Sequence, residues 1–129
     1  MNVNDYETIE RIKQIYSSIE ETMHKYGNED VFCKDTDYFN SVCLNVARLS
    51  REVIYNLSDD FKSIHKDSIY FKGYEALYRN IRTNYDDVKK SPFGVWSLVN
   101  AEVKNDVSLL THLVDYEGVD YEEEQDRGR

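Results

Sequence analysis

The residues best suited to chemistry lie in the segment Tyr78-Arg79-Asn80-Ile81-Arg82-Thr83-Asn84-Tyr85-Asp86. Arg79 and Arg82 are three residues apart, a spacing that projects both guanidinium groups from one face of a helix. Two such groups can hold a phosphate through paired hydrogen bonds, and Asn84 and Tyr85 can then contact a base or a ribose. The same residues also fit an ordinary charged helix end, and spacing alone favours that plainer interpretation.

Other familiar catalytic and metal-binding patterns are absent from the sequence. It has no glycine-rich phosphate loop, no HExxH pattern and no C-x-x-C pair. His24, His65 and His112 stand far apart in the chain, and a lone helical histidine is usually a surface or core residue. Cys33 and Cys43 lack the spacing of a zinc site, so we interpret them as free, partly buried thiols rather than a disulfide. We expect neither a metal nor a cofactor.

The charge of the chain is unevenly distributed. Its net value of −9 argues against a protein that binds nucleic acid over its whole surface. Residues 62–90, however, hold seven Lys/Arg, Lys72 among them, and four Asp/Glu, which leaves +3 for this segment and −12 for the rest. We therefore expect a local basic surface on this segment of an otherwise acidic protein.

Length and composition indicate one helical domain. The 129 residues are 40% hydrophobic and 32% charged, which is typical of a globular protein. With one proline and five glycines the chain has few turn signals, and this favours long helices over many short strands. No apolar stretch reaches the roughly 18 residues of a membrane span, and the N-terminus lacks a secretory signal, so we expect a cytoplasmic protein.

Apolar residues that recur at three- and four-residue steps predict the helices of the first half. The first helix covers Tyr6 to Tyr26. A loop at residues 27–36 leads to a second helix from about Asp37 to Asn56, which Asp35 or Thr36 can cap.

The second half of the chain is expected to hold shorter elements and one long final helix. Phe61 and Ile64 should pack in a short turn or helix, followed by a helix between Ser68 and Asn84 and a polar connection from Asp86 to Lys90. The final helix begins at Ser91-Pro92, because serine is a good N-cap and proline suits the first helical position. Its apolar rhythm is carried by Val95, Val99, Val103, Val107, Leu110 and Val114.

Together these elements predict an all-α fold. We expect an up-down antiparallel bundle of four to five helices over residues 1–115. Residues 116–129 contain Glu122-Glu123-Glu124 and no apolar period, so they are expected to form an acidic, flexible tail.

The order of these features resembles the HEPN domain of HepT-like proteins, over about residues 8–115. The matching stretches are Arg11-Ile12-Lys13-Gln14-Ile15, the entry from Asp35 to Phe39, Arg48-Leu49-Ser50-Arg51-Glu52-Val53, Asn56-Leu57-Ser58, Arg79-Asn80, Asn84-Tyr85-Asp86, Val95-Trp96, and Asp106-Val107 through Leu110. The resemblance implies a HEPN-like bundle and a ribonuclease toxin. It also implies a homodimer, in which two motif copies face each other across a cleft, and a nucleotidyltransferase-like MNT antitoxin as partner.

The active motif of that family is an arginine followed, after four to six residues, by a histidine. Arg79 and Asn80 match its start, but Asn84 and Tyr85 stand five and six residues after Arg79. In an alternative alignment, Asn84-Tyr85-Asp86 matches the residues that usually follow the histidine, which is then deleted. Both alignments leave the motif without its histidine, so the resemblance gives Arg79, Asn84 and Tyr85 as the catalytic positions.

The resemblance also assigns supporting positions. Glu52 matches the glutamate of the family's Gly-Glu-Ala stretch, while the bulky Arg51 replaces its glycine and alters how helices or subunits approach. Tyr85 matches the tyrosine that the antitoxin modifies with AMP, although its spacing from Arg79 is one residue short. His65, fourteen residues before Arg79, is a candidate to reach the dimer cleft in place of the missing histidine. The residues expected to contact RNA beside Arg79 are Arg82, Asn80 and Lys72.

Two functions remain open at this point. Loss of a general acid or base typically removes ~10²–10⁴-fold of the rate, so the missing histidine weakens the expectation of catalysis. The first function is an RNA-cleaving toxin, metal-independent when active, or a degenerate RNA-binding descendant in which Arg79 contacts phosphate. The alternative is a catalytically inactive HEPN interaction module that binds a nucleotidyltransferase-like partner. A helical dimer whose surface has drifted to another role is a third, plainer interpretation.

Overall fold

The protein is built from helices. The computed structural model describes residues 1–118, and the predicted tail from residue 119 onward lies outside the described residues. Residues 1–118 contain no strand, which confirms the all-α prediction. In chain order the helices are α1 (Val3–Tyr26), α2 (Glu29–Lys34), α3 (Thr36–Tyr55), α4 (Asp59–Ile64), α5 (Phe71–Thr83), α6 (Tyr85–Lys89), α7 (Pro92–Leu98), the π-helical turn η1 (Val99–Val103) and α8 (Lys104–Glu117).

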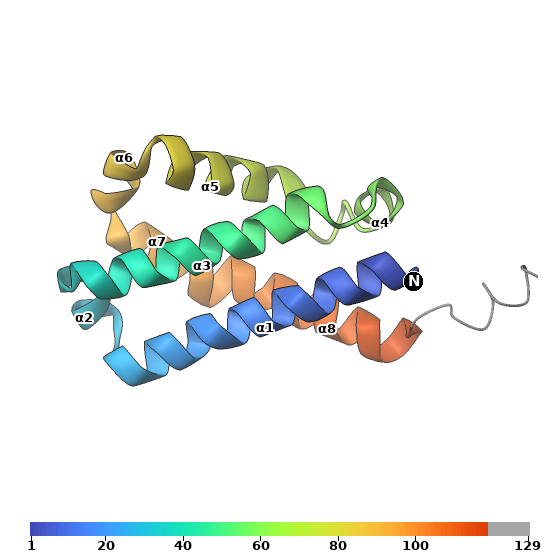
Figure 1. The fold of residues 1–129 in the computed structure, drawn as a ribbon, viewed down its shortest axis with the longest axis horizontal. Coiled ribbons are helices and arrows are strands. Elements are labelled where there is room, and N and C mark those ends of the chain that lie inside the picture. Colours follow the sequence, from blue (N-terminus) through green and yellow to red (C-terminus); the bar gives the residue numbers. More distant parts are fainter. Residues whose placement is uncertain (119–129) are drawn as a thin grey trace, which may run out of the picture.

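The long helices form an up-down bundle. Helices α1, α3, α5 and the continuous stretch α7–η1–α8 run in alternating directions (Figure 1). Helix α3 packs against both α1 and α5, and α1 packs in turn against α8. Helix α8 continues through Tyr116 and Glu117, two residues past the predicted end of the bundle. None of the helices within residues 1–118 is both long enough and apolar enough to cross a membrane.

The ends of α1 and α3 follow from local hydrogen bonding. The Asn2 side chain accepts from the Asp5 amide (2.7 Å) at the start of α1, and Asp35 caps α3 by accepting from the Tyr38 amide (3.1 Å). Helix α1 ends at Gly27, whose φ of 123° is open to glycine and strained for other residues. The predicted boundaries of these two helices are therefore confirmed within three residues.

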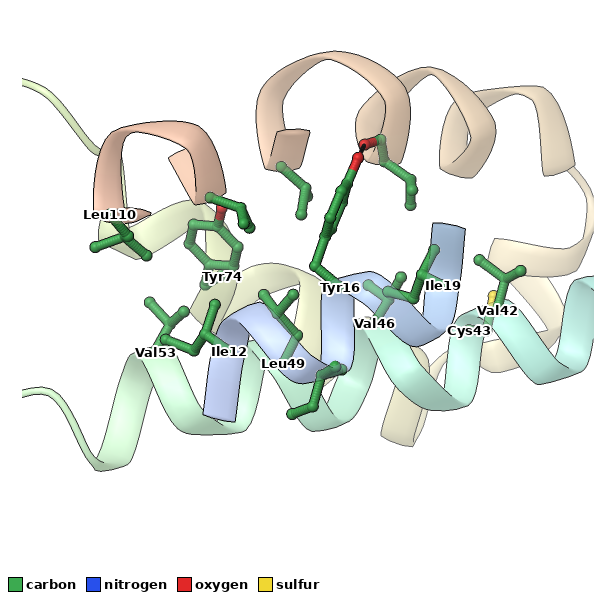
Figure 2. Close-up of a cluster of buried hydrophobic side chains, with 14 of the residues drawn as sticks. Ile12, Tyr16, Ile19, Val42, Cys43, Val46, Leu49, Val53, Tyr74 and Leu110 are labelled. Carbon is green, nitrogen blue, oxygen red and sulfur yellow. Dashed lines mark hydrogen bonds between the residues drawn. The ribbon is translucent and has the colours of Figure 1, made fainter. Parts of the chain in front are cut away.

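The apolar stripe of α3 forms the centre of the core. Val42, Val46, Leu49 and Val53 are buried between α1 and α5, facing Ile12 of α1 among others (Figure 2). The apolar residues predicted for the final helix, from Val95 to Val114, are likewise all buried. Helices shorter than about 12–15 residues are marginal in isolation, so this shared core is what stabilises the elements around it.

Two short helices replace segments that were predicted to be irregular. The expected loop at 27–36 contains α2, whose Phe32 is 1% exposed and packs edge-on against Tyr38 at 5.1 Å between ring centroids. The expected polar connection at 86–90 is largely helix α6. Each helix is too short to show a hydrophobic period, and for this reason the pattern of the sequence did not reveal them.

Helix α4 confirms only part of its prediction. The predicted short helix is present and Phe61 is buried in it, but Ile64 is 73% exposed, so the prediction that Ile64 packs as well was wrong. Ser58 caps the helix by accepting from the Phe61 amide, while its own hydroxyl and amide both donate to the buried Asp5 carboxylate (2.7 Å each). Helix α4 is six residues long and ends at Ile64, and Phe61 is its buried residue.

The final helix is interrupted by a π-helical turn that the sequence pattern did not predict. Tyr16 of α1 is buried beneath this turn, and its hydroxyl donates to the carbonyl of Val99 (3.1 Å). Figure 2 shows the Tyr16 ring directed toward the final helix. Burial, with the charge of Glu20 as a second cause, raises the pKa of Tyr16 to about 12, so the hydroxyl keeps its proton and remains a donor. A second link joins α5 to α8, where Tyr74 donates to Asp106 (2.6 Å).

The central position of α3 gives a matched pair of leucine substitutions. Leu49 is 1% exposed and Leu44, on the same helix, is 64% exposed. We expect Leu49→Ala to lower the free energy of unfolding by about 2–5 kcal/mol, because it removes buried methyl groups and leaves a cavity. Leu44→Ala should change it by less than about 0.5 kcal/mol. Urea unfolding followed by circular dichroism measures both values, and equal effects of the two variants would contradict the described core.

Candidate functional site

An open groove runs along the outer side of α3, between α1 and α5. Its volume is about 800 Å³. We call it the arginine groove and define it by its arginines Arg11, Arg48, Arg51 and Arg82, together with Glu52, Tyr55 and Tyr78. The charged side chains that line it are thus four cations and one anion, on a chain whose net charge is −9.

Helical spacing explains why these residues share one surface. Leu49 and Val53 of α3 point into the core, so Arg48, Arg51 and Tyr55 fall on the outward side of the same helix. The steps from Arg48 to Arg51 and from Arg51 to Tyr55 are three and four residues, which place all three side chains along one edge. The folding of α3 therefore orders the groove at the same time as the core.

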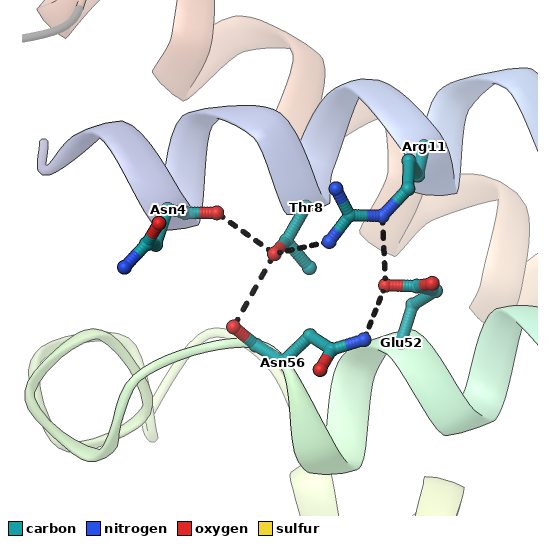
Figure 3. A network of polar contacts seen from close by, with 5 residues as sticks. All are labelled: Asn4, Thr8, Arg11, Glu52 and Asn56. Carbon is teal, nitrogen blue, oxygen red and sulfur yellow. Dashed lines mark hydrogen bonds and ion pairs between the residues drawn. The ribbon is translucent and has the colours of Figure 1, made fainter.

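Glu52 holds Arg11 in place rather than neutralising the whole groove. Its Oε2 accepts from Arg11 Nε (3.2 Å) and from Asn56 Nδ2 (2.7 Å), and Arg11 Nη2 also donates to the buried Thr8 hydroxyl (3.1 Å; Figure 3). The Arg11 side chain is 45% exposed, and an ion pair this exposed contributes about 0–1 kcal/mol. The main effect of the contact is to orient the Arg11 guanidinium.

The other arginines of the groove keep their positive charge unopposed. Within residues 1–118, none of them has an Asp or Glu oxygen within ion-pair distance. Arg48 donates to the neutral amide oxygen of Asn45 (3.0 Å). Arg82 donates to the Tyr78 hydroxyl (3.2 Å), and its guanidinium carbon lies 5.2 Å from the centre of that ring. Such an arrangement favours an anionic ligand.

Arg79 lines a second hollow that adjoins the arginine groove. This hollow, of about 420 Å³, shares Tyr55, Tyr78 and Arg82 with the groove and is also lined by Glu75. Arg79 and Arg82 therefore face the same hollow, as their spacing predicts. Arg79 is exposed and makes no ion pair within the described part of the chain.

The structure separates Tyr85 from Arg79. Tyr85 lines a third hollow with Asn40, Cys43 and Leu44, and its hydroxyl donates to Asn40. Burial is the main cause that raises the pKa of Tyr85 to about 12, and burial raises the pKa of the adjacent Cys43 thiol to about 12 as well. Tyr85 is therefore a poor proton donor or acceptor near neutral pH.

The remaining predicted residues are spread along α4 and α5. Asn84, at the end of α5, donates to the Asn80 side chain (3.3 Å), and Lys72 is exposed in the first turn of that helix, away from both arginine-lined hollows. His65 follows α4 and lies against Phe61, 4.5 Å between ring centroids. No histidine of residues 1–118 lines the arginine groove or the Arg79 hollow, and no three His, Cys, Asp or Glu side chains there are placed to hold a metal ion.

Sequence reasoning missed part of this surface. Arg11, Arg48 and Tyr55 were not predicted to bind a ligand, and Arg51 was predicted only to alter how helices or subunits approach. The available signal was the same three-residue step, Arg48 to Arg51, that singled out Arg79 and Arg82. That the two pairs line adjoining hollows, however, depends on the packing of α3 against α5, which no local spacing reveals.

The two cysteines provide a test of the environment described around Tyr85. Both are free, with Cys43 buried and Cys33 exposed, so the prediction of partial burial was wrong for Cys33. We expect a thiol reagent at pH 8 to label one cysteine of the native protein rapidly. The thiolate is the reactive form, and the raised pKa of Cys43 leaves almost none of it at that pH.

The variant Cys33→Ser should lose the rapid phase, whereas Cys43→Ser should keep it. In denaturant both cysteines of the parent protein should react. Equally rapid labelling of Cys43 in the native Cys33→Ser protein would contradict its burial beneath Tyr85.

Comparison of the chain with protein-family models, curated proteins and solved structures finds no significant match. The resemblance to the HEPN domain therefore stays a prediction made from the order of sequence features. The fold and the arginine-lined surface rest on the geometry of the chain itself.

Proposed function

We propose that this chain is a HepT-like component of a HEPN/MNT toxin–antitoxin system that binds RNA, with Arg79 contacting a phosphate, and does not cleave it. The observation that carries the proposal is the continuous arginine-lined surface formed by the arginine groove and the adjoining Arg79 hollow. The partner in this proposal is the MNT nucleotidyltransferase-like antitoxin, and the assembly is a homodimer.

Charge supports RNA as the ligand of this surface. Guanidinium groups bind phosphate through planar, paired hydrogen bonds, and those of Arg79 and Arg82 are available on one face. Most of the remaining chain is acidic and repels a polyanion. Contact with RNA is thereby directed to the face that carries the arginines.

Chemistry argues against cleavage. Attack by the RNA 2′-hydroxyl requires one group that accepts a proton and another that protonates the leaving oxygen. Asn84 transfers no protons near neutral pH, and Tyr85 has a raised pKa and lies in a different hollow from Arg79. The arginines can stabilise a charged phosphate, but they can neither accept the proton of the 2′-hydroxyl nor protonate the leaving oxygen.

The second candidate function is a catalytically inactive HEPN module whose ligand is the nucleotidyltransferase-like partner alone. Among residues 1–118 no histidine lines either arginine-lined hollow, and this favours the second function as much as it favours RNA binding without cleavage. The two functions differ in their affinity for RNA. The interaction module forms a stable complex with the partner and does not bind RNA.

Substitution of Arg79 tests the proposed function. We expect Arg79→Ala to weaken RNA binding roughly ten- to a hundredfold, since a hydrogen bond to a charged group contributes about 1.5–3 kcal/mol. Arg79→Lys should recover only part of the affinity, because lysine keeps the charge and loses the paired geometry. Fluorescence anisotropy with labelled RNA at fixed salt measures these changes.

Lys104→Ala is the matched control, since it removes one exposed positive charge from α8, outside both arginine-lined hollows. It should leave RNA binding nearly unchanged. Unchanged binding by Arg79→Ala would count against the proposal, and so would cleavage of RNA by the parent protein that Arg79→Ala abolishes.

A further inference from the structure

The arginine groove contains an exposed aromatic side chain as well as cations. We propose that it is a binding site for single-stranded RNA, in which one unpaired base stacks on Tyr55 while the adjoining phosphates contact Arg48, Arg51 and Arg82. This inference rests on the proposed function and deepens it, because it names the form of RNA and the residues that distinguish it.

Tyr55 is placed as a stacking surface. Its side chain is 66% exposed and lies at the boundary of the arginine groove and the Arg79 hollow, since it lines both. Tyr78 meets it nearly at a right angle, with 6.1 Å between ring centroids and 80° between ring planes. Arg82 lies against Tyr78 in turn. Tyr55 thus has one neighbour that steadies the ring and most of its surface open to a ligand.

The arginines are arranged to follow a backbone that passes Tyr55. Arg48, Arg51 and Tyr55 lie along one edge of α3, and seven residues of helix span about 10 Å. Across the groove, Arg82 extends from α5 next to Tyr78, and Arg11 extends from α1 in the orientation that Glu52 and Thr8 fix. Cations from α1, α3 and α5 therefore line the groove that contains the exposed ring, where they can contact phosphates next to a stacked base.

The exposed ring of Tyr55 favours a single strand over a duplex. Bases in a duplex are stacked on one another, so their faces cannot reach Tyr55, whereas unpaired bases can be splayed onto aromatic side chains. Stacking of a base on an aromatic ring contributes about 1–3 kcal/mol and tolerates any base, because every base has a flat face. The arginines add an affinity that depends on salt and not on sequence.

The experiment compares three ligands: a short labelled single strand of RNA, a duplex of the same length, and ADP as a free nucleotide. The parent chain should bind the single strand most tightly. Tyr55→Ala should weaken that binding roughly five- to a hundredfold, and Tyr55→Phe, which keeps the ring, should bind nearly as the parent does. Tyr116→Ala, which removes a tyrosine that is 82% exposed on α8, is the matched control and should have no effect.

The arginines are tested by salt dependence. The double variant Arg48→Ala with Arg51→Ala should reduce the slope of the logarithm of affinity against the logarithm of salt concentration by roughly 1.4, since each phosphate contact to a single strand contributes about 0.7. Arg48, Arg51 and Tyr55 are all exposed, so the circular dichroism spectrum of each variant should match that of the parent chain.

Three results would overturn the inference: equal affinity for duplex and single strand, an unchanged affinity in Tyr55→Ala, or Tyr55-dependent binding of ADP without binding of RNA. If Arg79→Ala weakens RNA binding and Tyr55→Ala does not, this inference fails and the proposed function stands. If no RNA binds to the parent chain, both fail.

Discussion

The burial of the apolar stripe of α3 between α1 and α5 is the constraint on which the rest of the structure depends. Leu49 and Val53 fix the rotation of α3 about its axis, because turning the helix would expose them. The same rotation determines where Arg48, Arg51 and Tyr55 emerge. A substitution that disturbs the core stripe would therefore also displace the surface that carries the arginines, and effects on stability and binding have to be measured together.

The final helix is joined to this core through polar contacts as well as apolar ones. The π-helical turn at Val99–Val103 changes the local hydrogen-bond pattern, and the Tyr16 hydroxyl binds the Val99 carbonyl at that place. A buried carbonyl without a partner costs about 1–3 kcal/mol, so this contact lets the irregular turn lie inside the bundle. On the neighbouring side, Tyr74 and Asp106 connect α5 to α8.

The sequence predicted the long helices because their apolar residues repeat over many turns, whereas α2 and α6 are too short to show a repeat. The candidate surface divides in the same way. The placement of Arg79 and Arg82 follows from spacing within one helix. That Arg51 and Arg82 line one groove follows from contact between two helices, and the separation of Tyr85 from Arg79 follows from the start of a new helix at Tyr85.

The acidic character of the chain and its arginine groove are consistent with one another. Glu52 is the only carboxylate that lines the groove within the described residues, and its oxygen is occupied by Arg11 and Asn56. It therefore orients one cation and leaves Arg48, Arg51 and Arg82 unopposed. Screening reduces interactions between exposed charges beyond about 8–10 Å at physiological salt, so the distant acidic residues weaken this local field little. Net charge alone is thus a poor guide to the ligand, and the placement of a few arginines decides which surface an anion can approach.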